Sequence, residues 1–173
     1  VAAAVSPQVQ NLPLPWQVVM QTGVPRTTQG RASPLVVDLS ALWAGPLCSH
    51  LLQLAGARVV KVESLQRPDG ARLGPAEFYD LINHGKASVA LDFSTAQGIG
   101  QLRTLLEHAD IVIEASRPRA LRQLGIVAEE LVATKPGMTW ISITGYGRTA
   151  PQMDWIAYGD DAGVAAGLSG LLL

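Results

Sequence analysis

The chain has 173 residues, enough for one ordinary domain, with 13 Lys and Arg against 14 Asp and Glu, 48% hydrophobic residues and a single cysteine. The near-neutral charge argues against a general nucleic-acid binder, and one cysteine excludes an internal disulfide framework and a cysteine-rich zinc site. Because no run approaches the roughly 18 apolar residues of a membrane span and no charged segment precedes an apolar one at the N-terminus, we expect a cytoplasmic α/β protein with no membrane or nucleic-acid partner.

Residues 1–33 differ from the rest of the chain. They contain four prolines and no sustained hydrophobic period, which predicts an irregular N-terminal arm. Trp16, Val18, Val19 and Met20 are apolar enough that we expect part of the arm to pack against something. Two interpretations stay open, a strap across the chain's own domain, which we favour, and a segment that binds a partner.

A predicted βαβ unit follows the arm. The β-branched runs at residues 36–39 and 58–63 predict two buried strands. Between them, Pro46 suits a first helical turn, leucines over residues 47–54 form an apolar stripe, and Gly56 ends the helix. A strand, a helix and a strand in so short a stretch predict that the two strands are parallel.

The alternation of strands and helices continues to the C-terminus. In chain order we predict a polar loop at 64–74, a helix at 76–83, a strand at 88–93, a helix from a Ser94–Gln97 capping box to about His108, a strand at 110–114, a basic loop at 116–122, a helix at 128–134, a strand at 138–144 and a glycine-interrupted helix at 162–173. This pattern predicts an α/β fold with an open, mostly parallel sheet and helices on both faces. The apolar end of the chain suggests that it is part of a longer polypeptide.

Three loops are candidates for a ligand site. In an open parallel sheet, ligands bind beyond the carboxyl ends of the strands. Residues 40–45, 92–95 and 115–122 each follow a predicted strand. The first of these loops leads into a helix N-terminus, where free N–H groups attract anions. We therefore expect the three loops to meet at one edge of the sheet.

Basic side chains near these loops suggest the ligand's chemistry. The third loop contains Arg117, Arg119 and Arg122, and Arg72 and Lys86 from neighbouring loops can join them. Such a group suits a polyanionic small molecule, such as a nucleotide or a coenzyme with phosphates. The alternative is that these arginines are simply solvated surface residues.

Other common sites do not match the sequence. Glu63 stands where the ribose-binding acid of a nicotinamide dinucleotide site is expected, but Gly45 alone does not make the required glycine signature. No P-loop, metal-ligand histidine spacing or Ser-His-Asp arrangement is present. Cys48 and His50 lie on the first predicted helix, and we interpret both as packing or surface residues.

Five stretches then follow one another in a specific order between about residues 36 and 169. They are VVDLSALWAGPLCSHLLQLAGARVVKVE, RPDGAR, NHGKASVALDFST, ADIVIEASRPRALRQLGI and SITGYGRTAP. In this order they resemble CoA-transferase family III, also called CaiB/BaiF, which includes formyl-CoA transferase, carnitine CoA-transferase and α-methylacyl-CoA racemase.

The resemblance implies an architecture. Members have a Rossmann-like large domain and a smaller second domain, and two chains interlock in a homodimer. Residues 1–33 would then be an irregular arm, and residues 34–173 an incomplete Rossmann-like CoA-binding domain, the N-terminal part of the large domain. The rest of that domain and the small domain are expected beyond Leu173.

The resemblance also implies a reaction. Transferases of this family move CoA from an acyl-CoA to a small carboxylic acid through an aspartyl mixed anhydride and an enzyme-bound CoA thioester, with no metal. The nucleophilic aspartate is expected beyond Leu173, so residues 1–173 alone should be inactive. Tyr158 matches an active-site tyrosine, whereas we interpret Asp160 and Asp161 as carboxylates of a helix N-terminus. The alternatives are an α-methylacyl-CoA racemase, against which Tyr158 in place of a histidine argues, and a non-catalytic CoA-binding homologue.

The CoA-binding residues that the resemblance implies lie in the loops already selected. Ser64 and Gln123 stand where family members often have arginine, although Arg122 is adjacent to Gln123, and Trp43 stands where transferases often have glutamine. The predicted CoA-binding set, with Arg72 added from the charge pattern, is Trp43, Ala44, Ser64, Arg72, Leu91, Asp92, Phe93, Ser94, Ala115, Ser116, Arg117 and Arg122.

Overall fold

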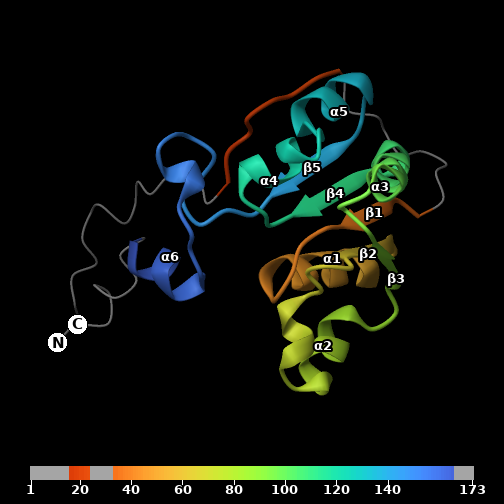
Figure 1. Cartoon of the computed structure of the whole chain (residues 1–173), viewed down its shortest axis with the longest axis vertical. Helices are drawn as coiled ribbons and strands as arrows, with labels where there is room; N and C mark the ends of the chain where they lie inside the picture. The colour runs from red at the N-terminus through yellow and green to blue at the C-terminus, as the bar shows by residue number, and fades with distance from the viewer. Residues whose placement is uncertain (1–15, 24–32, 166–173) are drawn as a thin grey trace.

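A computed structural model describes residues 16–23 and 33–165 of the chain. Their core is one sheet of five parallel strands in the order β3-β2-β1-β4-β5 (Figure 1). The strands are β1 (Leu35–Asp38), β2 (Arg58–Ser64), β3 (Ala87–Leu91), β4 (Ile111–Glu114) and β5 (Thr139–Ser142). The strand order reverses at β1, which therefore has β4 as its neighbour, as in doubly wound nucleotide-binding folds. The predicted α/β fold with a Rossmann-like sheet is confirmed.

Helices cover both faces of the sheet. Figure 1 shows α1 and α2 on one side of the strands and α3, α4 and α5 on the other. The helices are α1 (Ala44–Leu54), α2 (Ala76–Asn83), α3 (Ala96–His108), α4 (Pro118–Gln123), α5 (Ala128–Thr134) and α6 (Gly159–Ala165), with short 3-10 turns η2 (Gly70–Leu73) and η3 (Gln152–Asp154). Among the described residues, no helix is long and apolar enough to cross a membrane.

Alternation along the strands explains the two layers. In a strand, successive side chains point to opposite faces. Val37 faces the larger core, where it packs with Leu102 and Leu106 of α3. Val36 faces the smaller core beneath α1, where Cys48 and Leu52 pack. Burial, with a further contribution from the Asp38 carboxylate, raises the pKa of the Cys48 thiol, as expected for a packing residue.

Several boundaries differ from the sequence-based expectation. Thr95, not Ser94, caps α3, because the Ser94 hydroxyl is bound to Asp92 while Thr95 Oγ1 accepts the Gly98 N–H at 3.0 Å. The predicted basic loop largely forms α4, since Pro118 fits the first helical turn. The last helix starts at Gly159, and its predicted continuation through residues 166–173 lies outside the described residues.

The described part of the arm, residues 16–23, runs past α5 (Figure 1). Thr22 Oγ1 donates to the carbonyl oxygen of Val132 on that helix at 3.0 Å. Trp16, Val18 and Val19 do not pack against the described part of the domain, because each is more than 60% exposed, and the interpretation as a partner-binding segment stays open. The division into an arm and a domain stays a prediction, and residues 1–15 and 24–32 lie outside the described residues.

Two glycines of α3 allow a matched test of this packing. A Cβ on Gly98 would lie 1.9 Å from the carbonyl oxygen of Asp92, whereas a Cβ on Gly100 meets nothing within 4 Å. We expect Gly98→Ala to lower the free energy of unfolding by about 1–3 kcal/mol through overpacking, and Gly100→Ala to raise it by up to ~1 kcal/mol through helix propensity. Urea denaturation of both variants measures this, and equal effects would contradict the close approach of α3 to the β3 end.

Candidate functional site

Three strands lead into the same local structure at the carboxyl edge of the sheet. At the ends of β1 and β4 and directly after β3, an acidic residue is followed two positions later by serine. One carboxylate oxygen accepts both the backbone N–H and the hydroxyl of that serine, and the N–H distance is 2.9 Å in each case. This bonding closes a tight turn and directs the chain away from the sheet. The three pairs are Asp38–Ser40, Asp92–Ser94 and Glu114–Ser116.

The topology brings the three predicted loops to one edge. Because the strands are parallel, the loops that follow β1, β3 and β4 all leave the same side of the sheet. Asp38 is in register with Ile113, the residue before Glu114, so the loops after β1 and β4 are direct neighbours. The loop after β3 lies farther along this edge, beyond the end of β2.

Four charged side chains are buried beneath this edge, each at most 1% exposed. Lys61 Nζ lies 2.9 Å from Asp69 Oδ2, and Lys86 Nζ lies 3.4 Å from Asp38 Oδ2. Two cations thus face two anions with no net charge, as buried charges require. We call Asp38, Lys61, Asp69 and Lys86 the buried charge cluster.

The structure corrects the expectation that Lys86 faces a ligand. Its ammonium donates to Ser49 Oγ and to the Pro46 carbonyl oxygen, both at 2.8 Å, and to Asn83 Oδ1 at 3.0 Å. Burial lowers the pKa of Lys86, and the Asp38 carboxylate opposes this shift. Lys86 therefore ties the turn after α2 to α1 and has no exposed donor for a ligand.

Asp69 and Lys61 hold the loop after β1, and sequence reasoning missed both residues. Asp69 Oδ1 accepts the N–H groups of Leu42 and Ala71 at 2.9 Å, and Lys61 donates to the Ser40 carbonyl oxygen. Burial raises the pKa of Asp69, but the Lys61 ammonium and these N–H donors outweigh it, so the pKa lies below its ordinary value. A lysine inside the apolar run Val-Val-Lys-Val was the signal for a buried pair.

Arg72 is fixed at the surface beside this cluster. Its guanidinium donates to both oxygens of Glu63, with Nη2 2.7 Å from Oε1, and lies 4.1 Å from the centre of the Tyr79 ring. Hydrogen bonds from Arg72 lead the effects that lower the pKa of Glu63 to about 2, and burial with the Glu63 charge raises that of Tyr79 to about 12. The Arg72 side chain remains 43% exposed, so it is a positioned cation at the rim of the edge.

The arginines after β4 divide into two groups. Arg122 pairs with Glu129 of α5 at 3.2 Å. Arg117 and Arg119 are exposed, and neither has an ion-pair partner within the described ranges 16–23 and 33–165. Arg117 is the N-cap residue of α4, directly before its first residue, Pro118. Two uncompensated cations therefore stand next to the point where the strand order reverses.

The other predicted contact residues differ in what they expose. Trp43 is 63% exposed, with its ring edge-on to Phe78 at 5.8 Å, and Ala44 starts α1. Ser64 Oγ donates to Gln66 at 2.9 Å, and Gln66 in turn reaches Asp92. Ser94 and Ala115 are exposed, Ser116 and Phe93 are half-buried, and the Leu91 side chain belongs to the larger core and does not face the edge.

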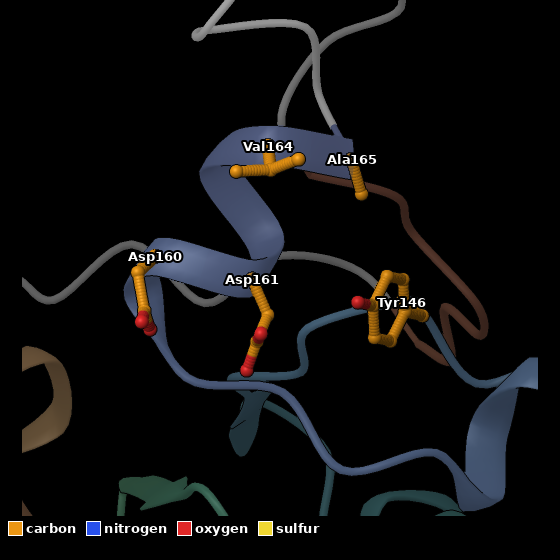
Figure 2. Close-up of a pocket in the computed structure, with 5 residues that line it drawn as sticks. All are labelled: Tyr146, Asp160, Asp161, Val164 and Ala165. Atoms are coloured by element: carbon orange, nitrogen blue, oxygen red, sulfur yellow. The ribbon is translucent and has the colours of Figure 1, made fainter.

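The C-terminal residues form a separate, shallow pocket of about 330 Å³. Figure 2 shows the Tyr146 ring and the Asp161 carboxylate beside the same space, which Asp160, Val164 and Ala165 also line. Asp160 and Asp161 occupy the first turn of α6, as predicted. Tyr158 lies outside this lining and is 62% exposed, and Asp161 accepts its backbone N–H at 3.1 Å.

Comparison with known sequences gives a consistent result. A model described as CoA-transferase family III matches residues 34–172. A succinyl-CoA–D-citramalate CoA-transferase from Chloroflexus aurantiacus is 34% identical over 131 residues, 72% of this chain and 33% of that protein. A succinate–glutarate CoA-transferase from Agrobacterium fabrum is 33% identical over 150 residues, 79% of this chain and 37% of that protein. The chain thus spans about a third of the length of these curated relatives.

Solved structures agree with the sequence matches. A CAIB/BAIF family protein from Brucella suis superposes with a TM-score of 0.70 at 32% identity, and the match covers 79% of this chain and 40% of that one. The hypothetical protein Rv3272 from Mycobacterium tuberculosis superposes with a TM-score of 0.71 at 31% identity, covering 78% and 39% of the two chains.

The Glu63–Arg72 pair makes a prediction about acid stability. Folding lowers the pKa of Glu63 from 4.5 to about 2, so its contribution to stability is complete above pH 4.5 and is lost as the pH falls towards 2. Between these values the free energy of unfolding should fall less steeply in Glu63→Gln than in the wild type. Tyr79→Phe, which keeps the Arg72 pair, should retain most of the wild-type slope. Denaturant titrations across this range provide the measurement, and identical slopes in wild type and Glu63→Gln would contradict the pairing.

Proposed function

The chain belongs to CoA-transferase family III, and on this premise we propose that the carboxyl edge of its sheet binds the phosphate-bearing part of coenzyme A. The observation that carries the proposal is the pair of uncompensated arginines, Arg117 and Arg119, next to the reversal of strand order. Coenzyme A carries a diphosphate and a 3′-phosphate, and guanidinium groups bind phosphate oxygens through paired, charge-assisted hydrogen bonds.

Neighbouring residues supply the other contacts that this ligand needs. The exposed ring of Trp43 offers a flat apolar face to the adenine base, at the loop that leads into α1. Arg72 presents a fixed cation whose orientation is set by Glu63 and Tyr79. Ser64, Asp92, Ser94, Ala115 and Ser116 lie along the same edge and belong to the proposed binding surface, whereas Leu91 and Phe93 support it from the core side.

We propose that the full-length protein transfers CoA from an acyl-CoA to a carboxylic acid. An aspartate outside residues 1–173 would attack the thioester to give an aspartyl mixed anhydride and free CoA, and CoA would then attack the aspartyl carbonyl, releasing the donor acid and leaving an enzyme-bound CoA thioester. The acceptor carboxylate would then attack the enzyme-bound thioester, releasing CoA and forming a second mixed anhydride. The released CoA would attack the acceptor's acyl carbonyl, which gives the new acyl-CoA and frees the aspartate. The residues described here would contribute binding and orientation of CoA, with Tyr158 near the reacting end and a second chain completing an interlocked homodimer.

The chemistry of the relatives narrows the substrate class. Two of the matched proteins are named for transfer between succinate and other small di- or hydroxyacids, D-citramalate and glutarate. We therefore propose succinyl-CoA as a donor to test first, with short dicarboxylates as acceptors.

Substitution of Arg117 tests the binding site. Arg117→Ala removes a charge-assisted phosphate contact, so we expect the dissociation constant for coenzyme A to rise about 5- to 150-fold, equivalent to roughly 1–3 kcal/mol. Arg58→Ala is the matched control, because Arg58 is also exposed but lies at the opposite edge of the sheet. Isothermal titration calorimetry measures both, and an unchanged affinity in Arg117→Ala would show that the basic segment is only a solvated surface.

Transfer itself is tested with the full-length protein, succinyl-CoA and isotopically labelled glutarate. We expect label to appear in glutaryl-CoA with release of one succinate for each glutaryl-CoA formed. Exchange of an α-hydrogen of a branched acyl-CoA with solvent deuterium, without any thioester transfer, would instead support the racemase. Binding of coenzyme A with neither reaction would support a non-catalytic homologue.

A further inference from the structure

A carboxylate buried below the loop after β1 is bound to that loop at a single amide. Asp69 is 4% exposed and is the N-cap residue of η2, where its side chain accepts the Ala71 N–H. The same oxygen, Oδ1, also accepts the N–H of Leu42 at 2.9 Å, across 27 positions of sequence. The side chain that caps η2 therefore also fixes the backbone of a different loop.

The backbone at this amide needs such support. Leu42 has a φ of +69°, and it is the one non-glycine residue with a positive φ among residues 16–23 and 33–165. A bulky side chain in the left-handed region costs free energy and persists only where the surroundings hold it. The Leu42 side chain is 44% exposed, so packing alone does not hold this conformation, and the Leu42 N–H is fixed by its hydrogen bond to Asp69.

A second contact holds the same loop two residues earlier. Lys61 Nζ donates to the Ser40 carbonyl oxygen and is paired with Asp69 Oδ2 at 2.9 Å. Lys61 and Asp69 thus bind the loop at one carbonyl and one N–H while neutralising each other. The residues directly after Leu42 are Trp43 and Ala44, which the proposed function assigns to coenzyme contact.

We propose that Asp69, charge-balanced by Lys61, is a positioning residue that sets the left-handed turn at Leu42 and thereby presents Trp43 and the start of α1 to coenzyme A. The proposal rests on the proposed function for the identity of the ligand. The Asp69 side chain is buried and has no exposed atom to offer a ligand, so its effect acts through the loop.

Paired double substitutions separate positioning from folding. Removing one charge alone would leave its partner buried and unpaired, so both variants carry Lys61→Met. Lys61→Met/Asp69→Asn keeps a side-chain oxygen that can accept the Leu42 N–H, whereas Lys61→Met/Asp69→Leu has similar volume and no acceptor. Asp110→Leu is the control for loss of a carboxylate that binds backbone, because Asp110 Oδ2 accepts the Leu35 N–H at 2.9 Å at the opposite edge of the sheet.

Two readouts in the full-length protein decide the proposal. Relative to Lys61→Met/Asp69→Asn, the leucine double variant should show at least tenfold faster hydrogen exchange of the Leu42 amide and at least a tenfold higher KM for the acyl-CoA, with kcat changed less than threefold. Asp110→Leu should lower thermal stability without raising that KM.

The possible failures have different meanings. If the Leu42 amide is freed but the KM of the two double variants is equal, or if Asp110→Leu raises the KM as much, the positioning role is overturned and the proposed function stands. Equal amide exchange in the two double variants also overturns it. If the wild type binds neither coenzyme A nor an acyl-CoA, the proposed function fails, and the positioning role fails with it.

Discussion

The carboxyl edge of this sheet depends on neutralising a lysine that is buried in a central strand. Lys61 is 1% exposed, and an unpaired charge at such a site would destabilise the fold by about 3–5 kcal/mol. Asp69 supplies the opposite charge, and to reach Lys61 the segment after β2 must fold back over the end of β1. That requirement places Asp69 beside Leu42 and Glu63 beside Arg72, so one ion pair determines the shape of two loops at once.

The basic residues near this edge consequently have two separate roles. Lys61 and Lys86 are compensated by Asp69 and Asp38, and they stabilise the loops from below. Arg117 and Arg119 are exposed and uncompensated within the described residues, which leaves their charge available to an anion. In the proposed function, phosphate recognition falls to these side chains, which folding does not use, whereas the acid-x-serine pairs close the turns at the strand ends.

The sequence predicted what depends on local pattern. The alternation of short apolar runs with helical segments predicted all five strands, and the rule for parallel sheets placed the three loops at one edge. Sequence analysis failed where the role of a side chain depends on the partner that it binds in the folded chain. Lys86 resembled a free cation until its distant partner Asp38 was known, and Ser94 resembled a cap although Asp92 binds its hydroxyl. The acid-x-serine spacing and the lysine within an apolar strand were both visible, but their meaning depended on which segments the fold brings together.

A crystal structure of the full-length protein with bound coenzyme A tests the central claim most directly. The account predicts phosphate oxygens within hydrogen-bond distance of the Arg117 guanidinium and the adenine base against Trp43, with the buried charge cluster unchanged. Coenzyme A bound away from the carboxyl ends of β1 and β4, with Arg117 and Arg119 pointing into solvent, would contradict it.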